Sequence, residues 1–234
     1  MDYRHELKFL VSEQEVEIIR YRLKPLMRMD EHQEEESYVV RSLYFDDLND
    51  SCMRENEDGV DNRRKFRIRI YNGNDNVIMI EKKIKHRGMT RKFSEKITRE
   101  QCLTYMSGRP PALTQNSSRM QGELFAEMKM NGMRPAVIVE YDRTAFVERR
   151  GNVRITLDRN ISGNNKISAF LDKHLLPIPV LPVGLHILEV KYDQLLPQYI
   201  SNVLEIGTLQ QSSFSKYYYA RDFIQWTRGY LNEL

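Results

Sequence analysis

The chain has 234 residues, of which 41% are hydrophobic and 29% charged, and its formal net charge is +3 at pH 7. This length allows one large domain or two small ones, and the small net charge argues against a protein that coats nucleic acid. The two cysteines lie outside any CxxC spacing, which excludes a disulfide framework and a structural zinc site. No apolar run reaches the roughly 18 residues of a membrane span, so we expect a cytoplasmic protein with no membrane span in this chain.

The first part of the sequence reads as a strand, a helix and a second strand. Arg4–Val11 is the first strand. Ser12 followed by Glu15 is a capping-box pattern, which predicts the start of a helix. Val39–Asp46 reads as the second strand, and Leu48–Glu57 as a short polar helix or a loop.

The strongest hairpin signal in the chain follows. Lys65–Tyr71 and Val77–Lys85 are strand-like segments joined by the turn sequence NGNDN at Asn72–Asn76. A further strand at Met89–Ile97 extends the hairpin into a meander. Consecutive antiparallel strands of this kind favour a large antiparallel sheet.

The second half of the chain contains further helices and strands. Because the strands are mostly joined as hairpins, we predict an α+β fold and a single domain over residues 1–234. The expected elements are helices at Thr98–Tyr105, Ser117–Met130, Leu195–Ile206 and Ser215–Leu231, strands at Pro135–Val147, Val153–Ile161 and Leu185–Asp193, and a loop at Pro177–Pro182.

Charged residues recur at every second position in several predicted strands. Alternate residues of a strand point to the same face, so one face of each strand is charged. A single face of this kind is ordinary for a solvated sheet, where an ExK pair is a surface ion pair worth about 0–1 kcal/mol. Several basic faces in one chain indicate a concave surface or barrel interior that holds a polyanion. The segments are Glu6/Lys8, Lys65/Arg67/Arg69 and Glu81/Lys83/Lys85.

Polyphosphate requires many donors at fixed spacing, because each phosphate carries about one negative charge and several acceptor oxygens. Arginine supplies a planar fork and lysine a point charge. Strands of a barrel supply the spacing, because every second side chain points inward. The expected inward set is Lys8, Arg67, Arg69, Lys83, Lys85, Arg143, Arg154 and Lys191, with Glu6, Glu81 and Glu189 among them.

An ordered series of motifs resembles a known family. ELK, SLYFD, RKFRIRIY, EKK, YDRTAF, VRITLD, LEVK and FSKYYYA follow one another as in the VTC polyphosphate polymerase domain of the triphosphate tunnel (CYTH-like) superfamily. The resemblance covers about residues 3–228. It implies an antiparallel β-barrel that forms a tunnel with flanking helices, metal-dependent chemistry on triphosphates, and inorganic polyphosphate as product or ligand. We expect no regulatory or transmembrane partner domain of the kind found in eukaryotic relatives, so we do not expect a coupled export role.

The resemblance also implies roles for individual residues. SK at Ser215 and Lys216 lies at the start of the last predicted helix, where backbone N–H groups favour an anion. The metal is expected to be Mn²⁺ or Mg²⁺, with Glu189 as its clearest ligand and Glu6 and Glu81 as further candidates. The implied catalytic residues are Lys8, Arg67, Arg69, Lys83, Arg143, Arg154 and Lys216, and the implied substrate-binding residues are Tyr141, Lys85, Lys92, Lys191 and Ser215.

We therefore expect a polyphosphate polymerase that uses ATP or another triphosphate. A metal-dependent tripolyphosphatase or nucleoside triphosphatase needs the same residues, and a non-catalytic polyphosphate-binding domain is a further alternative. A nucleotide cyclase needs a ribose-activating site, which the sequence does not reveal. The run Tyr217–Tyr219 with Phe214 could form a stacking platform for bases, but helix packing against the core explains it more simply. The sequence does not show which protein partners the chain has.

Overall fold

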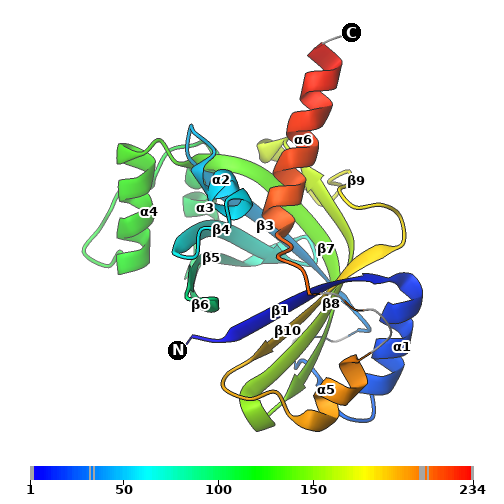
Figure 1. Cartoon of the computed structure of the whole chain (residues 1–234). Helices are drawn as coiled ribbons and strands as arrows, with labels where there is room; N and C mark the ends of the chain where they lie inside the picture. Colours follow the sequence, from blue (N-terminus) through cyan, green and yellow to red (C-terminus); the bar gives the residue numbers. More distant parts are fainter. Residues whose placement is uncertain (1–2, 32, 34, 206–208, 210, 233–234) are drawn as a thin grey trace.

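The computed structural model describes residues 3–31, 33, 35–205, 209 and 211–232, with side chains up to residue 225. Its strands form one antiparallel sheet in the order β1-β10-β8-β7-β3-β4-β5-β6, with β2 paired to β7 and β9 to β8 (Figure 1). The strands are β1 (His5–Ser12), β2 (Arg28–Met29), β3 (Tyr38–Asp46), β4 (Arg63–Tyr71), β5 (Asn74–His86), β6 (Met89–Ile97), β7 (Arg134–Glu148), β8 (Val153–Asn164), β9 (Ile178–Pro179) and β10 (Leu185–Tyr192).

Helices cover the outer face of the sheet in two groups. Helices α1 (Glu13–Leu23) and α5 (Gln198–Leu204) pack on β1, β10 and β8 through one hydrophobic cluster. Helices α2 (Ser51–Glu57), α3 (Arg99–Met106) and α4 (Arg119–Met130) lie on the side of β3–β6, where a second cluster forms (Figure 1). Helix α6 (Lys216–Asn232) is the last element of the described chain. No helix in the described residues is long and apolar enough to cross a lipid bilayer.

The sheet curves until its two edge strands meet. Arg4, just before β1, and Thr90 of β6 exchange two backbone hydrogen bonds of 2.9 Å. Beyond this pair, the hydrogen-bonded ladder between β1 and β6 is not continuous. The predicted α+β class and antiparallel tunnel-type fold are confirmed, but the sheet is not closed into a complete barrel, because the described residues of its edge strands meet at this seam through one bridge rather than a full ladder.

Local sequence signals account for most element boundaries. Ser12 caps α1 in a capping box with Glu15, as predicted, and Thr98 caps α3 with Gln101 in the same way. The turn between β4 and β5 places Asn72 at φ 51° and the following glycine at φ 61°. Two consecutive positive φ angles are typical of a type I′ hairpin turn, which explains why this hairpin is readable from sequence.

Two local predictions differ from the structure, and one short strand was not predicted. The loop predicted at Pro177–Pro182 contains the short strand β9, and the pair of residues in β2 has no strand-like sequence signal. The helix predicted at Leu195–Ile206 begins only at Gln198, because Pro197 occupies the N-cap position. Its predicted last residue, Ile206, lies outside the described residues.

The hydrophobic cluster beneath α1 and α5 is expected to contribute most of the stability of the β1–β10–β8 region. Leu188 is fully buried in the cluster beneath α1 and α5, whereas Leu176 lies on the surface with 78% exposure. We expect Leu188→Ala to lower the free energy of unfolding by about 3 kcal/mol, because the lost burial is compounded by a cavity. The matched Leu176→Ala variant should change it by less than about 0.5 kcal/mol in urea denaturation. Equal effects of the two variants would contradict this packing.

Candidate active site

The strand register brings the charged residues onto one continuous inner face. Residues directly paired across two strands point to the same side of the sheet. Lys8 of β1 pairs with Glu189 of β10, and Glu6 pairs with Lys191. Between β4 and β5, Arg67 pairs with Glu81 and Lys65 with Lys83. The alternation seen in the sequence therefore becomes a single charged lining.

Two carboxylates and three lysines form one group, which we call the Glu6–Glu189 group: Glu6, Lys8, Lys83, Glu189 and Lys191. Lys83 Nζ of β5 donates to both oxygens of Glu6 of β1 at 2.7 Å. Lys8 Nζ lies 3.1 Å from Glu6 and 3.8 Å from Glu189. Lys191 Nζ lies 3.1 Å from Glu189 and 3.9 Å from Glu6. The two carboxylates thus share the same two amines and lie together.

The surrounding charges set the protonation of this group. Burial alone would raise the pKa of Glu6, but Lys83, Lys8 and Lys191 outweigh it and lower that pKa to about 2. Burial also opposes ionisation of Glu189, whose pKa is nevertheless held well below its usual value by Lys191 and Lys8. Desolvation lowers the pKa of Lys83 to about 8, although Glu6 works in the opposite direction. Both carboxylates are therefore ionised at neutral pH.

Arg143 connects this group to the first turn of α6. Its guanidinium binds Asp158 with two bonds of 2.6 and 2.7 Å and lies 3.7 Å from Glu189. Lys216 Nζ lies 2.7 Å from the same Asp158, and both cations lie over the ring of Tyr141 at 5.0 Å from its centroid. Sequence reasoning missed Asp158, although it lies four residues after Arg154 and hence on the same strand face.

Asp158→Asn is expected to lower the free energy of unfolding at pH 7 by about 3 kcal/mol, because Arg143 and Lys216 keep their charges and lose the carboxylate that neutralises them. Burial alone would raise the pKa of Asp158, but Arg143 and Lys216 outweigh burial and lower it below the usual 3.8. The stabilisation is present above the unfolded pKa and disappears as the pH falls through the folded one. In urea denaturation, the gap between variant and parent should narrow below about pH 4. A gap independent of pH would contradict this assignment.

A second group surrounds Glu81 on β4, β5 and β6, which we call the Glu81 group: Glu81, Arg67, Arg69 and Lys92. Arg67 holds one Glu81 oxygen at 2.6 Å through both Nε and Nη2, and Lys92 holds the other at 3.0 Å. Arg69 lies 3.6 Å from the same carboxylate. Burial would raise the pKa of Glu81, but Arg67, Arg69 and Lys92 lower it well below its usual value.

Lys65 belongs to the inner face and was missed as a site residue. Its amine lies 3.3 Å from Ser215 Oγ, 3.3 Å from Asn56 Oδ1 and 4.8 Å from the ring centroid of Tyr217. No ion pair joins it to a carboxylate of the described residues, and burial followed by repulsion from Arg63 lowers its pKa to about 7. The alternation with Arg67 and Arg69 in the strand was the signal that could have identified it.

Two predicted residues lie at the margins of the inner face. Arg154 pairs with Asp30 at 2.9 Å and donates to the Tyr38 hydroxyl at 3.2 Å, although its cross-strand neighbour is Lys191. Lys85 lies opposite Arg63 in the register, and burial together with that arginine lowers its pKa. The structure thus brings the other predicted site residues together, whereas Arg154 and Lys85 lie at the margins of the inner face.

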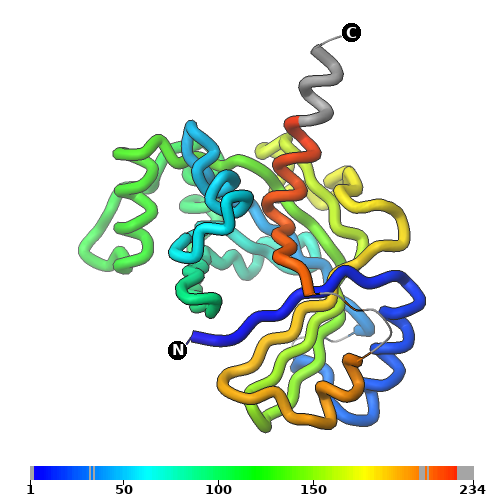
Figure 2. The backbone as a smooth tube through the Cα atoms, in the orientation of Figure 1, coloured from blue at the N-terminus to red at the C-terminus, as the bar shows by residue number. Residues whose placement is uncertain are grey.

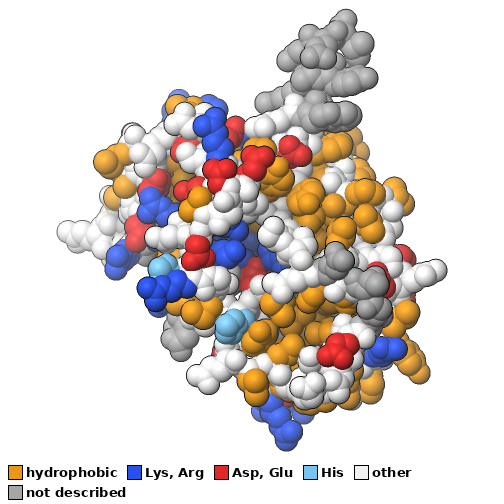
Figure 3. Space-filling model, in the orientation of Figure 1, with side chains coloured by type: hydrophobic (Ala, Val, Ile, Leu, Met, Phe, Trp, Pro, Cys, Tyr) orange, Lys and Arg blue, Asp and Glu red, His pale blue; other side chains and the backbone are white. Residues whose placement is uncertain are grey.

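The lysines of the Glu6–Glu189 group are accessible, whereas its carboxylates are not. The side chains of Lys8, Lys83 and Lys191 are 20%, 31% and 26% exposed, but those of Glu6 and Glu189 are 4% and 6% exposed. Figure 3 shows blue and red side chains gathered in a recess at the centre of the face above β1. An anion approaching this surface would therefore meet ammonium groups before carboxylates.

The arrangement fits a metal ion only in combination with a phosphate ligand. Among the described residues no cluster of three or more His, Cys, Asp or Glu side chains could hold a metal. Glu6 and Glu189 lie together, and Mg²⁺ is commonly held by one or two carboxylates plus phosphate oxygens. Glu81 lies in the other group, where guanidinium and ammonium groups occupy both its oxygens. The donor chemistry thus fits a metal at Glu6 and Glu189 better than at Glu81.

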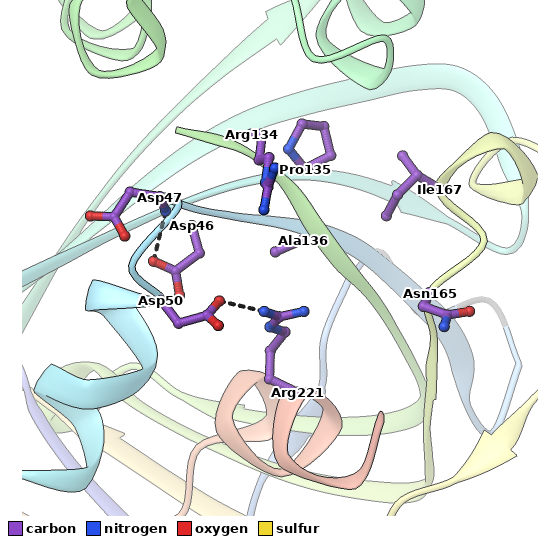
Figure 4. A pocket seen from close by; sticks show the side chains of 9 residues that line it. All are labelled: Asp46, Asp47, Asp50, Arg134, Pro135, Ala136, Asn165, Ile167 and Arg221. Carbon is purple, nitrogen blue, oxygen red and sulfur yellow. Dashed lines mark hydrogen bonds and ion pairs between the residues drawn. The ribbon is translucent and has the colours of Figure 1, made fainter. Parts of the chain in front are cut away.

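A separate pocket of about 200 Å³ lies among the ends of β3, β7 and α6 (Figure 4). Its acidic residues have partners within the fold: Asp46 accepts hydrogen bonds from the Cys52 N–H and the Tyr217 hydroxyl, and Asp50 pairs with Arg221. These contacts attach α2 and α6 to the end of β3. These contacts therefore hold the start of α6 in place, and the start of α6 contributes to the inner face.

Comparisons with solved structures find distant likenesses. PH1819 from Pyrococcus horikoshii OT3 shares 15% identity with a TM-score of 0.49, over 95% of this chain and 99% of that one. A conserved hypothetical protein from Pyrococcus furiosus gives 9% and 0.47, over 91% and 96%. The Mimivirus capping enzyme triphosphatase gives 10% and 0.40, over 87% of each chain. No curated protein matches the chain.

The sequence as a whole matches one described family. Residues 3–224 match the family model of the VTC domain, which covers nearly the same span as the motif series from ELK to FSKYYYA. The chain therefore belongs to the VTC domain family.

Proposed function

We propose that this protein is a polyphosphate polymerase, which transfers the γ-phosphate of ATP to the end of a growing chain of inorganic polyphosphate. The observation that carries the proposal is the inner face of the sheet, where partly exposed lysines and largely buried arginines surround a smaller number of buried carboxylates. Membership of the VTC domain family supports the same substrate class. Polyphosphate matches this lining because its charges repeat along its length.

The proposed reaction requires little covalent help from the protein. An ionised terminal oxygen of polyphosphate attacks the γ-phosphorus of ATP, and the bond from that phosphorus to the β–γ bridging oxygen breaks, so that ADP leaves. The attacking oxygen is already ionised, so no general base is needed. Catalysis then rests on positioning and on stabilising the spread negative charge.

The inner-face residues divide this work by their chemistry. Arg67, Arg69 and Arg143 bind Glu81, Ser42 and Asp158 through part of their guanidinium groups, and their remaining N–H groups are proposed to donate to phosphate oxygens. Lys8, Lys83 and Lys191 act as point charges, and each ammonium group has three N–H donors, so a lysine that contacts carboxylates can still donate to phosphate. Lys216 and the N–H groups at the start of α6 add donors at one end of the face.

Glu189, together with Glu6, is proposed to hold Mn²⁺ or Mg²⁺. When bound, the ion would supply positive charge to the triphosphate. Lys8 and Lys191 keep both carboxylates ionised and therefore ready to act as ligands. Glu81 is proposed instead to hold Arg67, Arg69 and Lys92 in place.

The experiment that tests the proposal is ATP turnover with Mn²⁺ or Mg²⁺, in which free phosphate and polyphosphate length are followed together on a gel. The proposal predicts a polyphosphate ladder and stoichiometric ADP. Free phosphate without a ladder would show that water is the acceptor and that the protein is a triphosphatase. Turnover absent with every metal, but polyphosphate binding retained, would identify a binding domain.

A further inference from the structure

The first turn of α6 presents an ordered aromatic ring at the surface. The rings of Phe214 and Tyr219 are stacked, with centroids 4.1 Å apart and planes 11° from parallel. Tyr218 meets Tyr219 edge-on at 5.6 Å and 87°. Phe214 is 3% exposed and Tyr219 is 37% exposed. One face of the Tyr219 ring is therefore supported by a buried ring, and part of its surface remains in solvent.

This aromatic pair lies beside the amines of the inner face. The backbone carbonyl of Phe214 accepts a hydrogen bond of 2.9 Å from Lys8 Nζ. The next residue, Ser215, lies 3.3 Å from the Lys65 amine through its hydroxyl. Figure 2 shows the chain crossing β1 immediately before α6 begins, and the recess of Figure 3 lies beside this crossing. The stacked rings and the cationic lining are thus neighbours.

Core packing, which explains the aromatic run at the sequence level, accounts for only part of it. Tyr217 is buried and its hydroxyl bonds Asp46, and Phe214 is buried in the same cluster. Tyr219 lies two residues after Tyr217, which places it on roughly the opposite side of the helix. Its ring stacks on the core instead of entering it.

On the basis of the proposed function, we propose that Tyr219, supported by Phe214, stacks against the nucleobase of the nucleoside triphosphate whose phosphates lie among the inner-face lysines. A purine or pyrimidine ring needs only a flat aromatic partner for this contact, whereas the triphosphate needs the neighbouring cations. Stacking of this kind tolerates any base, because each base has a π-face. The subsite therefore distinguishes a nucleotide from free tripolyphosphate, without selecting one base strongly.

The test measures binding by calorimetry, with the β,γ-imido analogue of ATP and with tripolyphosphate as two separate ligands. Tyr219→Ala is expected to raise the Kd of the nucleotide about tenfold and to change that of tripolyphosphate by less than about twofold. Tyr219→Phe should bind both ligands as the parent does, because the ring is kept. Tyr219→Leu, which retains apolar contact with Phe214, should behave like Tyr219→Ala. Tyr21→Ala, at an 81% exposed tyrosine of α1, is the control for surface tyrosine loss.

The outcomes separate this inference from the proposed function. An unchanged nucleotide Kd in Tyr219→Ala, or equal weakening of both ligands, overturns the nucleobase subsite. A raised nucleotide Kd with an unchanged tripolyphosphate Kd supports the subsite. If the gel then shows no polyphosphate ladder, only the polymerase proposal is overturned. Failure of the parent protein to bind the nucleotide overturns both.

Discussion

Replacing Arg67 with alanine is expected to lower ATP-dependent polyphosphate synthesis by about 100- to 1,000-fold. Arg67 belongs to the Glu81 group. Its Nε and Nη2 hold Glu81, and its Nη1 donates to the Tyr44 hydroxyl at 2.9 Å. Its remaining N–H groups are proposed to bind phosphate oxygens. The substitution removes that clamp and leaves Glu81 with excess negative charge on the inner face, so it both removes attraction and adds repulsion.

The same strand supplies a matched control for this variant. Arg64 lies an odd number of residues from Arg67, so it points to the outer face, where it pairs with Glu127 of α4. Arg64→Ala removes the same side chain and the same charge, and it should keep synthesis within about twofold of the parent. Circular dichroism and a urea midpoint for both variants establish that they are folded. Comparable losses of activity in folded Arg64→Ala and Arg67→Ala would show that the inner face has no special role.

Glu189→Gln is expected to lower turnover on the order of a thousandfold and to leave polyphosphate binding as tight as in the parent, or tighter. Glutamine keeps the shape of the side chain but lacks the charge needed to hold a divalent cation. The change also leaves Lys8, Lys191 and Arg143 with less neutralising charge, which favours a bound polyanion.

The measurements for this variant are single-turnover synthesis at several Mn²⁺ concentrations and polyphosphate affinity without metal. Glu81→Gln is the comparison, because it removes a carboxylate from the other group. We expect only Glu189→Gln to change the metal concentration that gives half-maximal rate. Full turnover in Glu189→Gln with unaltered metal dependence would contradict the assignment of Glu189 as a metal ligand.

Features encoded within a few residues could be predicted from the sequence. Three such features depend only on neighbouring residues: the capping box of Ser12 and Glu15, the Asn72–Gly73 turn and the charges at every second position of β4. They place the elements and decide which residues share a face. The tunnel fold itself came from the resemblance, because no local pattern shows how a sheet closes.

Features that depend on long-range register could not be predicted in this way. Lys83 and Glu6 are 77 positions apart, and their contact exists only because the sheet curves until its edge strands β1 and β6 meet. In the sequence, Glu81 lies two residues before a lysine, as Glu6 and Glu189 do, yet the fold pairs it with Arg67 instead of placing it with those two carboxylates. Strand pairing, rather than strand content, therefore decides which carboxylates lie together.

Lysine acetylation read by mass spectrometry measures whether polyphosphate binds on the inner face. Lys83 and Lys92 are 31% and 43% exposed on the inner face, and Lys24 is 49% exposed at the end of α1. The lowered pKa of Lys83, about 8, should also make its amine reactive in the free protein. Polyphosphate should protect Lys83 and Lys92 by about tenfold or more and leave Lys24 unchanged. Equal protection of all three lysines, or protection of Lys24 alone, would contradict binding on the inner face.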